Sequence, residues 1–380
     1  MPAATTRTPA TFFTQRRALL LTAFFAASTT HAAIPRYRVL PVEASRYSSS
    51  EASHLNESGQ VLVTVYDGPA QFAVWSPDKP LRRLAYPAGG ASSNTIALHV
   101  NRFGAAVGYT DANNDRRGIV WEPDGTMRYL VDAQFNYPSP ELIADDGTVI
   151  GTTASSGVLI GWAPGATLSR QLLPQFRPST DAFNEVSISG SGVGVGAHYL
   201  VRQLRARPYV RQDNDVHDLE IGGYVDGYAN GISEDTQWVS GLLSPTDEAN
   251  PELQPVRWHN STLEVLPPLP TGRFAGTNDI NSSGVTVGYG SIEALDLTVA
   301  TMWDVAGKPY DLNTLIDTDL NVHLHSSRGI NDAGQILTYG YEIIDGTLYT
   351  KSFLLDPISI PEPAAAWVAL PAALMLRRRR

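Results

Sequence analysis

Cysteine is absent from all 380 residues. Its absence excludes a disulfide framework, a thiolate metal site and a cysteine nucleophile. Charge is also scarce, with 17% charged against 43% hydrophobic residues, which is ordinary for a globular chain with a large core. The sequence contains neither the Gly-x-Ser-x-Gly motif of serine hydrolases nor a glycine-rich loop leading into a helix. A serine hydrolase elbow and a phosphate cradle are therefore not predicted.

Basic residues are few in the body of the chain. The whole sequence has a net charge of −10. Without the three arginines of residues 1–32 and the four of residues 377–380, 21 basic side chains face 38 acidic ones, a net charge of −17. Such a surface is a poor partner for nucleic acid and for anionic lipid. Residues 33–360 also lack an apolar run long enough to span a bilayer.

Residues 1–32 have the pattern of a secretory signal peptide. Three arginines precede the apolar stretch "ALLLTAFFAAS" at 18–28, and Thr30 and Ala32 mark a cleavage site before Ala33. The alternative is a membrane anchor, for which the apolar stretch is too short. We therefore expect the protein to be exported after cleavage.

Seven copies of one short pattern follow. "INSSGVTVGYG" (280–290) and "INDAGQILTYG" (330–340) show it most clearly, and "ISEDTQWVSGL" (232–242) is the most divergent copy. Asn or Asp in such a turn hydrogen-bonds the turn's own backbone, and glycine accepts a positive φ. The copies are spaced 43 to 50 residues apart, which indicates a repeat architecture. The turn glycines are Gly59, Gly104, Gly147, Gly192, Gly284 and Gly334, with Thr236 at this place in the fifth copy.

Each copy also has an aromatic residue about a third of a period after the turn, and in six copies a leucine eight to ten residues later. The aromatic residues are Trp75, Trp121, Trp162, Tyr209, Trp258, Trp303 and Phe353. The leucines are Leu84, Leu130, Leu172, Leu219, Leu266 and Leu312. Four short strands per unit without helical periodicity are typical of a propeller blade. The tryptophans are most simply core between blades.

The strand missing from the seventh unit is found at the start of the chain. "YRVLPV" (37–42) resembles "LEVLPP" (263–268), with Leu40 in the leucine position. We therefore predict an all-β, seven-bladed propeller over residues 33–357, closed by pairing of 37–42 with the strand containing Phe353 and Leu354. Closure would remove an open sheet edge. The glycines within the "VGY" strands, such as Gly108 and Gly288, are expected to allow close packing between blades around the axis.

The repeat "xINxxGxVVGY … FxWxxxGxxxDLxxL" is similar to HAF-type extracellular repeats. The stretch "YDLNTLIDTDLNVHLHSSRGINDAGQI" (310–336) matches most closely, and the resemblance covers nearly all of residues 37–357. It implies an exported bacterial repeat protein and assigns no activity.

The C-terminal residues 358–380 resemble the PEP-CTERM sorting signal. Its three parts occur in order as Pro361-Glu362-Pro363, the apolar stretch 364–376, and the arginine cluster Arg377, Arg378, Arg379 and Arg380. The resemblance implies an exosortase-type sorting enzyme as partner and transient inner-membrane association through 364–376. The stretch spans roughly 20 Å as a helix, against about 30 Å of hydrocarbon. We therefore expect removal of the tail and release to the cell surface or beyond.

One segment has the carboxylate spacing of a calcium loop. In "DANNDRRGIVWE" (111–122), Asp111, Asn113, Asp115 and Glu122 occupy ligand positions 1, 3, 5 and 12. Arg116 stands where the loop needs glycine. Calcium is the cofactor this segment would take. The alternative is a solvated acidic hairpin whose two arginines offset the charge.

Other candidate chemistry is sparse. His323 and His325 alternate as two zinc ligands on a strand would, without an evident third ligand. Asp145, Asp146 and Asp332 lie in repeat turns, where Asp forms turns.

The sequence favours an exported, monomeric surface or matrix protein with a non-catalytic binding or structural role, whose partner could be an exopolysaccharide. The alternative is an enzyme acting on extracellular glycan through acidic residues at the propeller mouth, since the fold hosts both classes.

Overall fold

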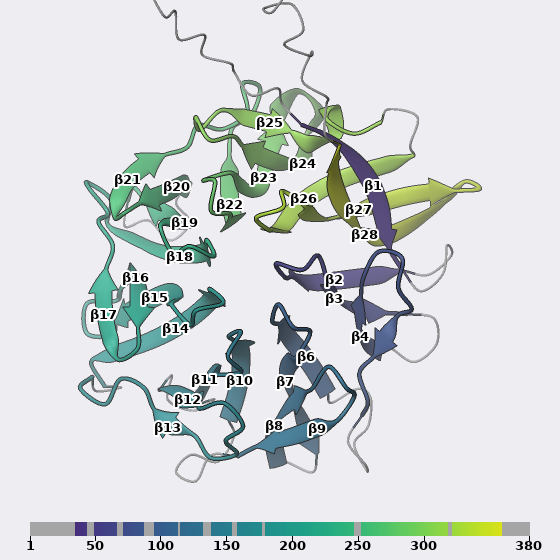
Figure 1. Cartoon of the computed structure of the whole chain (residues 1–380). Helices are drawn as coiled ribbons and strands as arrows, with labels where there is room; N and C mark the ends of the chain where they lie inside the picture. The colour runs from purple at the N-terminus through teal and green to yellow at the C-terminus, as the bar shows by residue number, and fades with distance from the viewer. Residues whose placement is uncertain are drawn as a thin grey trace, which may run out of the picture. The chain divides into compact units, whose positions relative to one another are not determined.

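The computed structural model of the protein describes residues 35–43, 49–66, 71–86, 95–112, 115–131, 138–153, 158–176, 179–246, 252–317 and 321–358. Their strands form seven four-stranded antiparallel sheets. Figure 1 shows the sheets following one another around a ring, with the first strand of each nearest the centre. The predicted seven-bladed propeller is therefore confirmed. No helix in the described part of the chain is long and apolar enough to cross a membrane.

The blades are numbered in chain order, and their strands run as follows. Blade 1 contains β2 (Ser50–Leu55), β3 (Val61–Val65), β4 (Gln71–Trp75) and β5 (Arg82–Arg83). Blade 2 contains β6 (Thr95–Val100), β7 (Ala106–Ala112), β8 (Asp115–Trp121) and β9 (Met127–Leu130). Blade 3 contains β10 (Pro138–Ile143), β11 (Val149–Thr153), β12 (Leu159–Trp162) and β13 (Arg170–Gln171). Blade 4 contains β14 (Asp181–Ile188), β15 (Gly194–Leu200), β16 (Arg205–Gln212) and β17 (Asp215–Asp218).

The remaining blades follow the same plan. Blade 5 contains β18 (Asp226–Ile232), β19 (Trp238–Ser244), β20 (Gln254–His259) and β21 (Thr262–Val265). Blade 6 contains β22 (Ala275–Ile280), β23 (Thr286–Ile292), β24 (Leu297–Trp303) and β25 (Pro309–Asp311). Two 3₁₀ turns, η2 (Glu293–Leu295) and η3 (Leu312–Thr314), lie before β24 and after β25. Blade 7 contains β26 (Val322–Ile330), β27 (Ile336–Ile344), β28 (Thr347–Ile358) and β1 (Arg36–Val42).

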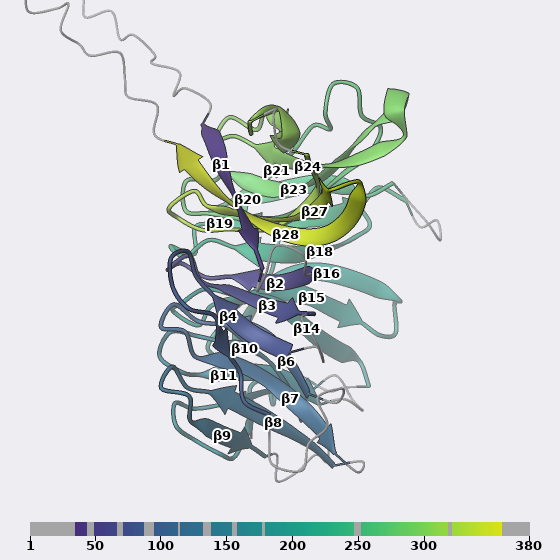
Figure 2. The same cartoon turned by 90° about the vertical axis from the view of Figure 1, so that its right-hand side faces the viewer.

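The ring is closed by the N-terminal strand, as predicted. β1 pairs antiparallel with β28, with Leu40 opposite Leu354 and Pro41 opposite Phe353. Figure 2 shows the purple β1 lying along the yellow β28. Both strands of this pair lie in one blade, so the two ends of the propeller are joined by backbone hydrogen bonds instead of leaving open edges.

The repeated aromatic residues form the core between blades, which confirms the prediction. Trp162 is fully buried and packs with Val107 and Val120 of blade 2 and Ile143 of its own blade. Its indole N–H donates to the carbonyl of Val131, just after the last strand of blade 2. The same bond to the preceding blade recurs for Trp121, Trp258 and Trp303. Trp75 differs, since it is only half-buried.

Glycine is required within the second strand of several blades for a reason that differs from the predicted one. A Cβ on Gly108 would lie 1.9 Å from the carbonyl oxygen of Ile96, in the first strand of the same blade. Gly288 meets the carbonyl of Gly276 at the same distance. Each such glycine lies opposite a β-bulge in that first strand, where one residue is skipped. The glycines therefore accommodate a bulge within the blade, and the expectation of close packing between blades was wrong.

Candidate functional site: the propeller mouth

The seven repeat turns that join the first and second strands surround one end of the ring's central axis, called here the mouth (Figure 1). Where the turn begins with Asn, its side chain has two roles. The Oδ1 atom of Asn331 accepts from the backbone N–H of Gln335 in its own turn at 3.0 Å. Its Nδ2 group donates to the carbonyl of Asn56 in the next blade at 3.3 Å. A carboxylate could supply only the first bond, so the repeat uses an amide.

The amide bond to the next blade recurs in four of the seven turns. Asn56 donates to Asn101, Asn101 to Ala144, and Asn281 to Asn331. In blades 3, 4 and 5 this first position is Ala144, Ser189 and Ser233. The two serines accept from their own turns but lack the length of an amide side chain. Sequence reasoning found the bond within the turn and missed the bond between blades.

The second position of the turns forms a further ring of contacts. The backbone N–H of Asp332 donates to Glu57 in the next blade at 3.0 Å, and that of Ser282 donates to Asp332 at 2.8 Å. Gly190 donates in the same way to Glu234. Asp145 and Asp332 are therefore more than the turn-formers expected from sequence, since each accepts from a neighbouring turn. Asp146, by contrast, accepts from Thr148 of its own turn.

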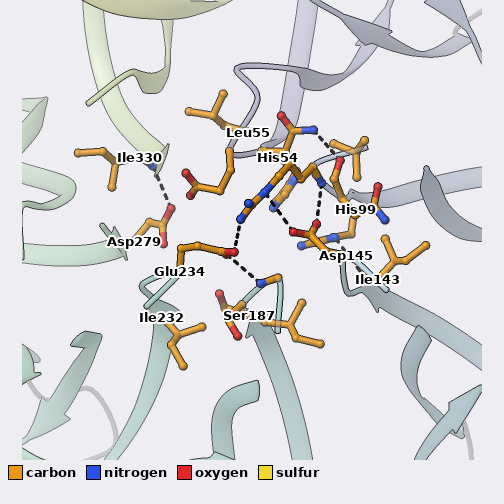
Figure 3. A pocket seen from close by; sticks show the side chains of 18 of the residues that line it. His54, Leu55, His99, Ile143, Asp145, Ser187, Ile232, Glu234, Asp279 and Ile330 are labelled. Atoms are coloured by element: carbon orange, nitrogen blue, oxygen red, sulfur yellow. Dashed lines mark hydrogen bonds and ion pairs between the residues drawn. The ribbon is translucent and has the colours of Figure 1, made fainter. Parts of the chain in front are cut away.

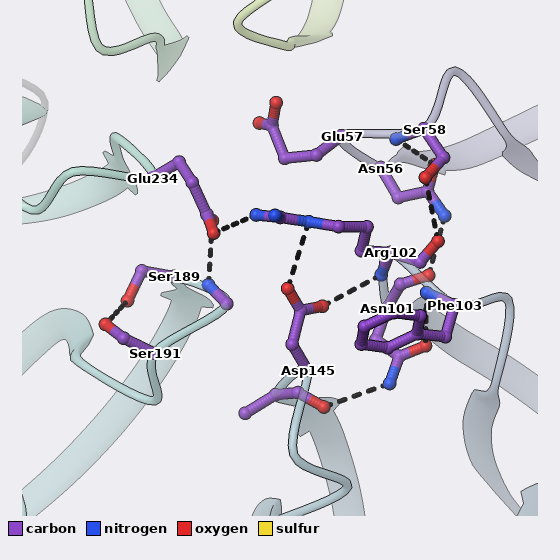
Figure 4. Close-up of polar contacts among 12 residues, drawn as sticks. Asn56, Glu57, Ser58, Asn101, Arg102, Phe103, Asp145, Ser189, Ser191 and Glu234 are labelled. Carbon is purple, nitrogen blue, oxygen red and sulfur yellow. Dashed lines mark hydrogen bonds and ion pairs between the residues drawn. The ribbon is translucent and has the colours of Figure 1, made fainter.

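Arg102 connects three blades across the mouth. Its backbone N–H donates to Asp145 of blade 3 at 3.0 Å, and its Nε lies 3.1 Å from the other oxygen of that carboxylate. Its Nη2 pairs with Glu234 of blade 5, whose second oxygen holds Gly190 of blade 4. Figure 4 shows the guanidinium lying between the two carboxylates. The mouth charges therefore contact one another and the turn backbone.

A small polar cavity of about 70 Å³ lies among these turns, as Figure 3 shows. At about 30 Å³ per molecule, it has room for roughly two waters. Its wall includes His54 and His99, each placed by the residue-skipping bulge of its strand. Their ring centroids are 3.8 Å apart. Burial lowers the pKa of His54 to about 4, and that of His99 lies well below its ordinary value for the same reason. Both rings are therefore neutral at pH 7.

Two carboxyl groups that line the cavity have pKa values raised above their ordinary range. Burial raises the pKa of Glu57 to about 7, against the opposing effect of the N–H of Asp332. Burial likewise raises the pKa of Asp279 to about 7, although the backbone N–H groups of Ile330 and Ile280 donate to it. Repulsion from Asp332 adds to the rise of both pKa values, and repulsion from Glu57 adds further to that of Asp279. Lining up the second positions of the repeat turns could have found Glu57 from sequence; Asp279 depends on the bulge.

The predicted calcium ligands do not come together as a set. Asp111 lies in β7 opposite Arg116, which binds both carboxylate oxygens at 2.9 Å. Glu122 follows the far end of β8, roughly 20 Å along the strand from Arg116 at about 3.3 Å per residue. The segment continues as a hairpin, so Asp111 and Glu122 lie far apart, and calcium binding near Asp111 and Asp115 stays a prediction. Asn113 and the side chain of Asp115 lie outside the described residues.

The remaining candidates also stay apart or outside the structure. His323 stacks on Tyr341 at 4.9 Å, while His325, the residue skipped by a bulge, lies edge-on to Tyr339. Within the described ranges, no group of three or more His, Asp or Glu side chains could hold a metal ion. The signal peptide 1–32 and the sorting residues Pro361 to Arg380 lie outside the described residues.

No protein-family model matches the sequence, and no curated protein matches it either. Among solved structures, the fold is similar to the β-propeller domain of the Trilobed protease from Pyrococcus furiosus, with a TM-score of 0.53 and 9% identity over 83% of this chain and 99% of that one. It is also similar to a streptogramin B lyase, with a TM-score of 0.50 and 10% identity over 85% and 98% of the two chains. At this identity the similarity establishes the β-propeller fold alone.

Proposed function

We propose that the protein is an exported, HAF-type repeat propeller with a non-catalytic binding role at the cell surface or in the extracellular matrix. The observation that supports this most is that acidic side chains at the mouth are already hydrogen-bonded to the protein backbone. Glu57, Asp145, Glu234 and Asp332 each accept from the backbone of a neighbouring turn. The cavity lined by Glu57, Asp145 and Glu234 has a volume of about 70 Å³, far below the roughly 300–1,000 Å³ of ligand pockets.

Delivery through the C-terminal tail is part of this proposal. The sequence from Pro361 to Arg380 has the order of a PEP-CTERM signal, and an exosortase-type enzyme would act at the outer side of the inner membrane. The four arginines would stay cytoplasmic by the positive-inside rule. Intact-mass measurement and fractionation of cells with and without the sorting enzyme test this step. A native chain still ending at Arg380, located identically in both cells, would contradict it.

The binding role is tested on the exopolysaccharide of the producing cell. Purified mature protein is run through native gels containing that polymer, and the released reducing ends and unsaturated ends are measured in parallel. We expect retarded migration without product. Free migration through the polymer would overturn the binding role, and product release would overturn the non-catalytic one.

One observation favours an enzyme as the second candidate. Glu57 and Asp279 line the same cavity, and each has a pKa raised to about 7, the range that suits a general acid at neutral pH. Glu57→Gln and Asp279→Asn separate the two functions. If depolymerisation occurs and either variant abolishes it while the fold is retained, the mouth is an active site.

A further inference from the structure

A second and much larger cavity lies at the ends of β22, β23 and β24 farthest from the mouth turns. Its volume is about 620 Å³, within the range of small-molecule sites. This rim cavity is lined by residues that include Phe274, Tyr289, Glu293, Asp296 and Leu297. It is nearly nine times the size of the mouth cavity, so it is the better place for a ligand.

Aromatic rings form one wall of the rim cavity. Phe274 is 43% exposed, and its ring lies edge-on to Tyr289 at 6.5 Å. Ser291, which is buried, accepts from the backbone N–H of Phe274 and of Arg273 and so fixes the start of β22. The ring of Tyr289 occupies the place of the missing side chain of Gly276, since a Cβ there would lie 2.5 Å from the ring. The wall is therefore built on strand backbone.

The aromatic surface continues toward the neighbouring blades. Tyr228 and Tyr199, on blades 5 and 4, are 37% and 43% exposed. The strand β18 that carries Tyr228 packs against β22 of blade 6 and β15 of blade 4. Burial first, and then the phenols of Tyr289 and Tyr199, raise the pKa of Tyr228. Exposed aromatic rings gathered in this way mark interaction surfaces.

The rest of the lining includes acidic side chains. Arg273 is neutralised by Glu252, with Nη2 and Oε1 2.6 Å apart. Glu293 and Asp296 are then the remaining charged lining groups, next to exposed Leu295 and Leu297. Carboxylates accept hydrogen bonds from hydroxyl groups, and the excess negative charge repels a polyanion. A sugar ring fits a lining of aromatic rings and carboxylates, because it has an apolar C–H face and hydroxyl groups around its edge.

We propose that the rim cavity binds neutral sugar units of an extracellular polysaccharide, with Phe274 and Tyr289 against the ring face and Glu293 and Asp296 accepting from its hydroxyls. This proposal rests on the proposed binding function, and it adds where on the protein the ligand binds and to which chemical class the ligand belongs. The mouth then serves to hold the blades together.

The test separates the exopolysaccharide of the producing cell into neutral and acidic fractions by anion exchange, and measures retardation of the protein in native gels containing each. We expect retardation by the neutral fraction alone. Phe274→Ala and Tyr289→Ala should each weaken it at least ten-fold, and Glu293→Lys should weaken it and introduce binding to the acidic fraction. Phe103→Ala is the matched control, since Phe103 is 65% exposed in a mouth turn.

The outcomes separate the two proposals. Retardation by the neutral fraction that survives all three rim variants, or retardation by the acidic fraction alone, would overturn the rim site and leave the binding function standing. Migration unaffected by either fraction would overturn both. Gly276→Ala covers the case in which Tyr289→Ala unfolds the blade, because it displaces the ring and leaves the tyrosine in the chain; unchanged binding in that variant would exclude Tyr289 from the site.

Discussion

Blades 1, 2, 6 and 7 differ from blades 3, 4 and 5 in how each is joined to the next at the mouth. The first group uses the neutral amides of Asn56, Asn101, Asn281 and Asn331. The second group lacks an amide at this turn position and contains more charged contacts instead. Arg102 reaches Asp145 and Glu234 across the mouth. Within blade 4 itself, Arg211 is buried against Glu185.

The difference shows what the repeat sequence encodes. The amide supplies a donor and an acceptor without a charge, so it closes a turn and joins two blades at little desolvation cost. Where the repeat has diverged, ionic contacts take over part of that role, and their value depends on burial, pH and salt. The ring therefore remains closed although its joints are not equivalent.

The largest effect on stability is expected at the buried ion pair of blade 4, one of the three blades without the amide. Glu185 and Arg211 have side chains only 1% and 3% exposed, joined by two bonds of 2.7 Å, and Arg211 also donates to the carbonyl of the turn residue Gly192. Arg211→Met would leave a buried, unpaired carboxylate, which costs about 3–5 kcal/mol of unfolding free energy. Urea unfolding followed by tryptophan fluorescence measures it.

The control for this variant is the double replacement Glu185→Leu with Arg211→Met. An apolar pair of similar volume is often as stable as the buried ion pair it replaces. The double variant should therefore recover most of the loss. If it is as unstable as Arg211→Met alone, the pair matters through its shape and its bond to Gly192, and its charges are not the cause.

A pH series tests the buried carboxyl group of Asp279, which lies in blade 6, one of the blades joined to the next by an amide. The folded chain holds this proton up to pH about 7, whereas the unfolded chain releases it near pH 4. Folding takes up a proton between these values, so stability from this group rises as pH falls from 7 to 4. Asp279→Asn should remove this slope, which amounts to about 2–4 kcal/mol.

The wild-type curve alone does not isolate this effect, because His54 and His99 act in the opposite direction. Both stay neutral in the folded chain below pH 6.5, where the unfolded chain binds protons, so their contribution falls on acidification. The difference between wild type and Asp279→Asn at each pH is therefore the quantity to compare. A difference that stays constant from pH 5 to 8 would contradict a raised pKa at Asp279.

A smaller effect is expected when an intact turn is converted to the diverged form. Asn331→Ser should keep a hydroxyl acceptor for the turn and lose the bond to Asn56, as at Ser189 and Ser233. We expect a loss of about 1–2 kcal/mol, since one buried hydrogen bond is removed and the Asn56 carbonyl loses its donor. Ser233→Asn is the reverse change and should gain about 1 kcal/mol. Thermal unfolding compares both, and equal stability of all three proteins would mean that the amide joint contributes nothing.

Sequence periodicity was enough to predict the fold, because the residues that define each blade lie close together along the chain. The turn glycines, the aromatic position and Leu40 gave the blade number and the closing strand, since each depends on spacing along the chain. The mouth could not be predicted in the same way. Arg102 reaches Glu234, 132 residues away, only because seven blades close into a ring, and Asp279 faces the cavity because a bulge skips Asn278. The spacing of Asp111 and Glu122 did not bring these two residues together, because spacing along the chain is not proximity once a segment is a strand.

The smallest effect tests the most diverged turn itself. Thr236 stands where the other turns have glycine, and it keeps the glycine conformation, with φ of +63°. A β-branched residue in this region is strained by about 1–2 kcal/mol. Thr236→Gly should therefore stabilise the protein by roughly 1 kcal/mol, because part of the relief is offset by the greater freedom of glycine in the unfolded chain. Gly147→Thr is the matched reverse, since Gly147 has φ of +88° and the nearest atom to its Cβ position is 4.0 Å away. It should destabilise by a similar amount without a steric clash. If both changes leave the melting temperature where it was, the turn backbone relaxes enough to remove the strain of a non-glycine residue at this position. The diverged blades would then be distinguished by their charges alone.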